Sequence, residues 1–119
     1  MRISQIIDLL DATILTGRPY EDKEIDFAFS SDMMSDVLAY ANKRMLLITG
    51  LTNPQAVRTA EMLDIECVLY VRAKSPSEQV IELAKDLGII VLGTKQTMFN
   101  TCGILYESGL RGGTRHDGC

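Results

Sequence analysis

One pattern occurs three times between residues 45 and 105 and limits the fold more than any other feature of the chain. In each copy a short apolar run ends at a polar turn, and an amphipathic segment with a helix cap follows. Successive strand–turn–helix units predict a parallel sheet with helices packed against its faces. The apolar runs are residues 45–49, 67–71 and 89–92, and the turns that follow them are residues 49–54, 72–76 and 93–97.

The remaining segments extend this prediction to a single α/β domain. Residues 4–10 have the apolar spacing of a short helix capped by Ser4, and residues 33–41 have the spacing of a second helix. Residues 12–15 and 25–29 indicate two further strands. We therefore expect a three-layer domain over residues 1–109, with a mostly parallel central sheet and helices on both faces. The glycine-rich residues 110–119 predict a flexible C-terminal tail.

The helix caps of the repeated units can be assigned from residue types. Asn53 is a good N-cap with Pro54 at the first helical position, and residues 75–78 form a capping box opened by Ser75. The third helix is expected to begin near Thr97. Its buried face is predicted to consist of Met98, Phe99, Cys102 and Leu105.

Composition excludes several classes of function. The 119-residue chain has a formal net charge of −4, which disfavours broad binding to nucleic acid. No apolar run has the length of a membrane span, and the N-terminus has no signal-peptide core, so we expect a cytoplasmic protein without a membrane partner. The three cysteines lie far apart, and Cys119 is expected to be exposed.

Signatures of catalysis and of bound cofactors are missing. The single histidine, His116, falls in the predicted tail, so neither a catalytic triad nor a histidine-based metal site is expected. The phosphate-binding G-x-x-x-x-G-K-[ST] and G-x-G-x-x-G spacings are both missing. We therefore predict no catalytic residues, no metal and no cofactor.

The turns after the three apolar runs form the best candidate site. In open parallel sheets, ligands bind beyond the carboxyl ends of the strands. Arg72, Lys74 and Lys95 place positive charge there in an otherwise acidic protein, which favours a small anionic ligand such as a nucleotide or a phosphate. The alternative is that the caps serve the fold alone and the lysines are simply solvated. The candidate residues are Thr49, Gly50, Thr52, Asn53, Arg72, Lys74, Ser75, Thr94, Lys95 and Thr97.

Residues 47–110 resemble the DRTGG domain family. The matching segments are residues 47–52, 57–60, the strand ending at Val71, 82–84 with 88–89, and 97–99, and upstream residues 3–34 look like the start of the HPr kinase N-terminal domain. Val57-Arg58 stands in place of the family's Asp-Arg, residues 72–74 in place of Thr-Gly-Gly, and Gln96-Thr97 in place of Asp-Thr. Arg58 and Thr97 carry over, so Arg58 joins the candidate ligand-binding residues.

The resemblance implies a regulatory or assembly module and not an enzyme. In larger proteins, DRTGG domains accompany CBS, phosphotransacetylase and pyrophosphatase regions, where they are associated with dimer contacts and with response to nucleotides. This chain looks like the small stand-alone members found beside iron-only hydrogenase and electron-bifurcating subunits. A homodimer is therefore expected, with HPr kinase activity absent because it belongs to a separate domain.

Two other functions remain open from the sequence. The chain could be an interaction module that helps a partner enzyme assemble and has no ligand of its own. It could also be a small enzyme that acts on a phosphorylated substrate, although no nucleophile and base can be paired.

Overall fold

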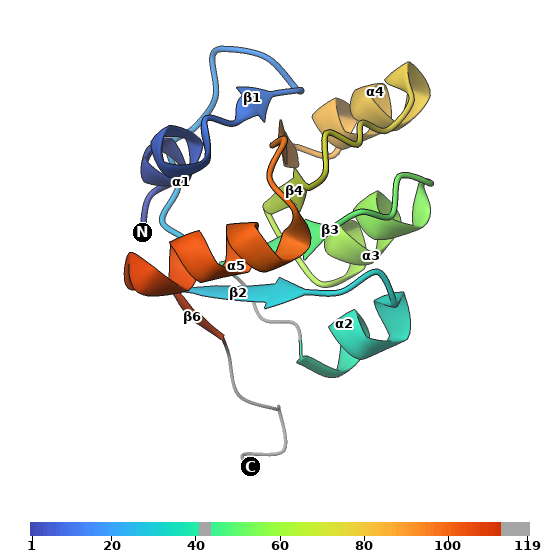
Figure 1. The fold of residues 1–119 in the computed structure, drawn as a ribbon. Helices are drawn as coiled ribbons and strands as arrows, with labels where there is room; N and C mark the ends of the chain where they lie inside the picture. Colours follow the sequence, from blue (N-terminus) through green and yellow to red (C-terminus); the bar gives the residue numbers. More distant parts are fainter. Residues whose placement is uncertain (41–43, 113–119) are drawn as a thin grey trace.

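The computed structural model describes residues 1–40 and 44–112. These residues form a six-stranded sheet in the order β1-β5-β4-β3-β2-β6, with helices packed on both faces (Figure 1). The α/β class and the three layers predicted from the sequence are confirmed. The helices are α1 (Ile3–Leu10), α2 (Met34–Tyr40), α3 (Gln55–Met62), α4 (Glu78–Asp86) and α5 (Met98–Glu107), and the strands are β1 (Thr13–Ile14), β2 (Phe27–Ser30), β3 (Met45–Thr49), β4 (Cys67–Tyr70), β5 (Ile90–Gly93) and β6 (Arg111–Gly112).

The sheet is parallel except at one edge. Strands β2, β3, β4 and β5 pair in parallel, β6 pairs with β2 in parallel, and β1 pairs with β5 in the antiparallel sense. Every residue of β3 and β4 is buried, which explains why their sequences are apolar without alternation. The parallel core brings the carboxyl ends of β2 to β5 to the same edge of the sheet.

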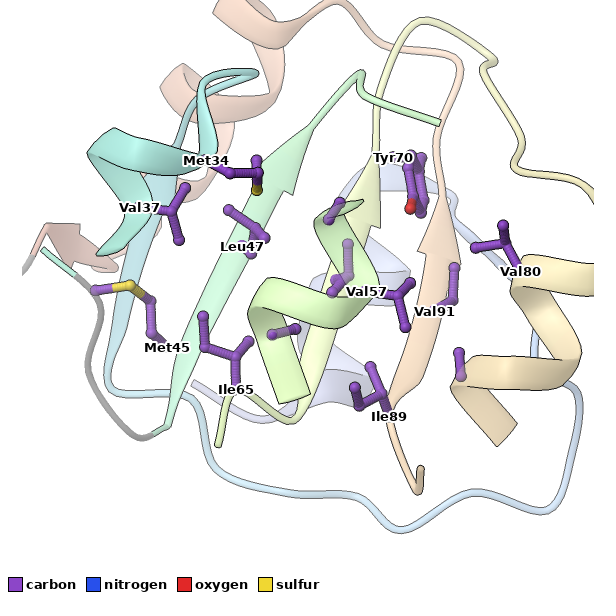
Figure 2. Packing of buried hydrophobic residues seen from close by; sticks show 14 residues of the cluster. Met34, Val37, Met45, Leu47, Val57, Ile65, Tyr70, Val80, Ile89 and Val91 are labelled. Atoms are coloured by element: carbon purple, nitrogen blue, oxygen red, sulfur yellow. The ribbon is translucent and has the colours of Figure 1, made fainter. Parts of the chain in front are cut away.

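Alternate side chains of the strands enter two separate cores. Met45 and Leu47 point to the face covered by α2, α3 and α4, whereas Leu46 and Ile48 point to the face covered by α1 and α5. Figure 2 shows the first of these cores, with α3 lying over the centre of the sheet and α4 beside it. The second core is closed by α5, which carries the chain back across the sheet so that β6 can pair with β2.

Three predicted helix caps are wrong by one or two residues. Helix α3 begins at Gln55 with Pro54 as its N-cap, so Asn53 lies one position before the cap. Helix α1 begins one residue earlier than expected, and Ser4 lies inside it, where its amide and hydroxyl both donate to the Asp22 carboxylate. Helix α4 is capped by Ser77, whose Oγ accepts from the Val80 N–H at 3.4 Å, and not by Ser75. Caps are fixed by where the chain turns onto the sheet, which residue types alone do not determine.

The predicted buried face of α5 is wrong at one position. Phe99 is 86% exposed, and Thr101 is fully buried instead. The stripe that faces the sheet runs through Met98, Thr101, Cys102 and Leu105, at helical spacings of three, four and seven residues. The sequence points to the larger apolar residue, but the crossing of α5 over the sheet brings the smaller one inside.

The predicted tail begins too early. Leu110 is 4% exposed and belongs to the second core, and Arg111–Gly112 add strand β6 to the sheet. The boundary expected after residue 109 is therefore wrong for these three residues. Ala41 of the predicted second helix, His116 and Cys119 lie outside the described residues. Among the described helices, none combines the length and the apolar character needed to cross a bilayer.

Candidate functional site

The carboxyl ends of the parallel strands form one continuous edge, which we call the carboxyl edge. It comprises residues 30–32 after β2, 49–53 after β3, 71–75 after β4 and 93–97 after β5, in that spatial order. All four segments come together because their strands are parallel and in register. All the predicted ligand-binding residues except Arg58 lie on this edge, and Arg58 follows in the first turns of α3.

Asp32 organises the middle of the carboxyl edge. Its Oδ1 accepts from the Thr49 hydroxyl at 3.0 Å and from the Gly50 N–H at 2.7 Å. Its Oδ2 lies 3.5 Å from Nη2 of Arg72. We call Asp32, Thr49, Gly50 and Arg72 the edge centre. The hydroxyl of the neighbouring Ser31 accepts from the Met33 N–H just before α2.

Gly50 leaves room for the Arg72 side chain. The Arg72 guanidinium lies over Gly50, and a Cβ at that position would clash with it. Arg72 and Ala73 both have left-handed backbone conformations, with φ of 62° and 57°. Their N–H groups donate to the carbonyls of Gln96 and Thr94, at 2.7 and 2.9 Å, so the turn is fastened to the next loop.

A cavity of about 530 Å³ opens beside the edge centre, between β1 and the turns after β4 and β5. We call it the β1–β5 cavity. Lys74 and Lys95 line it, and neither ammonium group has an ion pair or hydrogen bond among the described residues. Asp11 is the acidic residue in the lining. The full lining is Leu10, Asp11, Ala12, Thr13, Leu15, Ala73, Lys74, Ser75, Gly93, Thr94, Lys95 and Gln96.

Thr94 shapes this cavity from within the fold. It is 3% exposed, and its hydroxyl donates to the Leu10 carbonyl at 3.0 Å while accepting from the Gln96 N–H at 3.3 Å. Both capacities of the hydroxyl are thus used to join the end of α1 to the turn after β5. Thr94 therefore fixes the wall of the cavity between α1 and β5.

A second cavity of about 690 Å³ lies between the beginnings of α3 and α4, and we call it the α3–α4 cavity. Of the predicted ligand-binding residues it contains Thr52, Asn53 and Arg58. The Asn53 side chain accepts from the Gln55 N–H at 3.0 Å and thereby helps start α3. The lining is Thr52, Asn53, Pro54, Arg58, Ser77, Gln79, Val80 and Leu83.

The predicted ligand-binding residues therefore do not form one pocket. Lys74, Ser75, Thr94 and Lys95 line the β1–β5 cavity, whereas Thr49, Gly50 and Arg72 belong to the edge centre. Thr97 caps α5 by accepting from the Asn100 N–H at 3.3 Å. Sequence reasoning missed Asp11, Asp32 and Gln79, because acidic or amide residues in turns and first helical turns give no specific signal by themselves.

Two titratable groups at the two ends of β4 lie in apolar surroundings. Burial raises the pKa of the Cys67 thiol to about 12, and burial also raises the pKa of the Tyr70 hydroxyl to about 12. Both groups are therefore protonated at neutral pH and are poor nucleophiles. Within residues 1–40 and 44–112, no three metal-binding side chains gather into a metal site.

Comparisons with known proteins agree with this architecture. One solved structure, described as the CBS and DRTGG domains of the regulatory region of a Clostridium perfringens pyrophosphatase complexed with the activator diadenosine tetraphosphate, is similar with a TM-score of 0.69 and 19% identity. The match covers 89% of this chain and 46% of that one, so this chain spans about half of its length. No curated protein matches the chain in sequence. The family model of the DRTGG domain matches residues 5–108, and the chain therefore belongs to the DRTGG domain family.

Proposed function

We propose that this chain is a non-catalytic regulatory domain that binds a nucleotide or a similar small anionic metabolite in the β1–β5 cavity. The observation that carries the proposal is the pair Lys74 and Lys95, two exposed lysines without partners among the described residues that line one cavity of about 530 Å³. Two cations that form no ion pair attract phosphate groups. The volume is large enough for a nucleotide-sized ligand.

Arg72, the cation of the edge centre, is less available to an anionic ligand than the two lysines are. Arg72 faces Asp32 across Gly50, so its positive charge is already opposed by a carboxylate. An anion bound there would have to compete with Asp32. Lys74 and Lys95 share their cavity with Asp11 but form no ion pair among the described residues, and this difference favours the cavity as the ligand site.

The comparison with the pyrophosphatase region supports a regulatory role. That protein is described as complexed with a nucleotide activator, and its similarity to this chain extends to the fold. The family resemblance further favours a cytoplasmic homodimer that acts on a partner enzyme, for which hydrogenase or electron-bifurcating subunits are our candidates. The alternative is an interaction module without a ligand, and the third candidate, an enzyme for a phosphorylated substrate, has no identified nucleophile.

Isothermal titration calorimetry with AMP, ATP and diadenosine tetraphosphate tests the ligand. We expect at least one nucleotide to bind, and Lys74→Ala and Lys95→Ala each to weaken it by about tenfold, equivalent to about 1.4 kcal/mol. At a ligand concentration about 100 times the Kd, the free energy of unfolding should rise by about 2.7 kcal/mol. Lys85→Ala is the matched control, because Lys85 lies on α4 and pairs with Glu82.

Three outcomes separate the candidates. Binding that survives in both lysine variants would place the nucleotide elsewhere and reject this site. No binding of any nucleotide would leave the interaction module as the better explanation. Sedimentation analysis at micromolar concentration tests the homodimer, and a purely monomeric chain would contradict it.

A further inference from the structure

One buried polar group has no role in the site described so far. Tyr70 ends β4, and its side chain is fully buried in the core beneath α3 and α4. Its hydroxyl has no hydrogen-bond partner among the described residues. Buried polar groups are nearly always paired, because an unpaired group has lost its bonds to water without replacement. A hydrogen-bond acceptor on a bound ligand would satisfy this hydroxyl.

The position of the Tyr70 side chain indicates where that partner would enter. Figure 2 shows the ring between the beginning of α3 and Val80 of α4. Val80 packs in the same core as Tyr70 and also lines the α3–α4 cavity. Leu83, another residue of the lining, packs against this core as well. Tyr70 does not line the cavity of about 690 Å³, but Val80 and Leu83 belong both to the core that holds Tyr70 and to the cavity lining.

The opposite wall of this cavity carries an unopposed positive charge. The Arg58 guanidinium makes no ion pair or hydrogen bond among the described residues. The first turns of α3 and α4 both open onto the cavity, and their N–H groups add to the positive potential. A guanidinium fork matches a carboxylate in shape and charge. The cavity therefore combines a cationic mouth with an apolar floor, and Val80 of that floor packs in the same core as Tyr70.

We propose that the α3–α4 cavity is a second ligand site, which takes a short organic acid. The carboxylate would pair with Arg58 at the mouth, and the carbon chain would lie on Val80 and Leu83. A hydrogen-bond acceptor at the other end of the chain would receive the Tyr70 O–H once the Val80 side chain turns aside. This site uses none of the residues of the β1–β5 cavity, so it stands independently of the nucleotide site.

A pair of matched probes tests the proposal by NMR titration of the ¹⁵N-labelled chain. 4-Oxopentanoate has a carboxylate and a distant carbonyl oxygen, whereas pentanoate lacks the carbonyl. We expect 4-oxopentanoate to shift the amide signals of Arg58, Gln79 and Val80 and to bind about fivefold more tightly than pentanoate, as expected for one added hydrogen bond. Arg58→Ala should weaken both acids by about tenfold.

Tyr70→Phe is the decisive variant. It removes only the hydroxyl, so the preference for 4-oxopentanoate over pentanoate should disappear, while the ligand-free melting temperature should stay the same or rise. Thr101→Val is the matched control, because Thr101 is also fully buried with an unpaired hydroxyl but lies on α5, which covers the other face of the sheet. This control should leave the binding of both acids unchanged.

Three results would overturn the proposal. The first is the lack of any shift of these amides with either acid. The second is equal affinity for the two acids in the unmodified chain, which would show that the Tyr70 hydroxyl is not reached. The third is binding of inorganic phosphate that is as tight as that of 4-oxopentanoate, which would reduce the site to anion attraction at two helix N-termini.

Discussion

The edge centre and the β1–β5 cavity lie side by side on the carboxyl edge, yet the cation of the first has a carboxylate partner and the cations of the second have none among the described residues. In the edge centre, one carboxylate satisfies the hydroxyl of Thr49, the N–H of Gly50 and the guanidinium of Arg72. In the β1–β5 cavity, Lys74 and Lys95 have no such partner among the described residues. Polar residues at the ends of parallel strands therefore fall into two classes, those that hold the turns together and those that remain available to a ligand.

The position of the acidic residues explains the difference. Asp32 follows β2, which neighbours β3, so it faces the turns after β3 and β4. The strand on the far side of β5 is β1, and only Asp11 from the preceding turn contributes a carboxylate to the cavity. The order of the strands thus decides which cations are neutralised. The predictions below separate the two regions by the effect of each change on stability or binding.

The largest effect on stability is expected from two buried groups of β4, which lie outside both regions. Cys67 has an ordinary pKa of 9.0 that burial raises to about 12, and Tyr70 has one of 10.0 that is raised to about 12. A raised pKa stabilises the fold below the unfolded value, and this contribution is lost as pH rises toward the folded value. Between pH 8 and 10.5, the free energy of unfolding should fall by roughly 2 kcal/mol from Cys67 alone. Urea unfolding at both pH values measures the loss, and Cys67→Ala should remove most of it.

The next effect tests whether the edge centre holds the turns together. Asp32→Ala removes the acceptor of the Thr49 hydroxyl and of the Gly50 N–H. We expect the free energy of unfolding to fall by about 2 kcal/mol in urea unfolding, because two hydrogen bonds are lost and Thr49 is buried. Asp36→Ala, on the exposed face of α2, is the matched control and should cost less than about 0.5 kcal/mol. Equal effects of the two variants would mean that Asp32 does not organise this region.

A smaller effect tests the close approach of Arg72 to Gly50. In Gly50→Ala the new methyl group displaces the Arg72 guanidinium from Asp32. We expect a loss of about 1 kcal/mol, since the ion pair is largely exposed and the arginine can move aside. The loss should be much smaller when Arg72 is already alanine, so a double-mutant cycle measures the coupling. Additive effects would show that the two residues do not interact.

The smallest effect on stability is expected in the β1–β5 cavity. The double variant Lys74→Ala/Lys95→Ala should change the free energy of unfolding by less than about 0.5 kcal/mol, because neither lysine has a partner to lose. The same variant should abolish nucleotide binding in calorimetry. A loss of stability comparable to that of Asp32→Ala would show that these lysines stabilise the fold, and it would argue against the proposed ligand site.

The sequence predicts the strands better than it predicts the partners of the turn residues. The apolar runs predict β3 without error and predict β4 and β5 to within one residue, because a strand buried on both faces must be apolar throughout. The sequence also places the candidate residues on one edge. It gives no means to distinguish Arg72 from Lys74, since both are cations in the same turn and the carboxylate that separates them lies 40 residues away from Arg72.

The sequence alone determines that this chain forms a mostly parallel sheet covered by helices, because apolar periodicity and helix caps act over short stretches of chain. Only the tertiary structure decides which turn residues satisfy one another, which helix face is buried at Phe99 and Thr101, and that Leu110 returns to the core. These outcomes depend on the order of the strands and on the crossing of α5 over the sheet. Both the strand order and the crossing of α5 depend on contacts between segments that are far apart in the sequence, and a local sequence pattern does not contain that information.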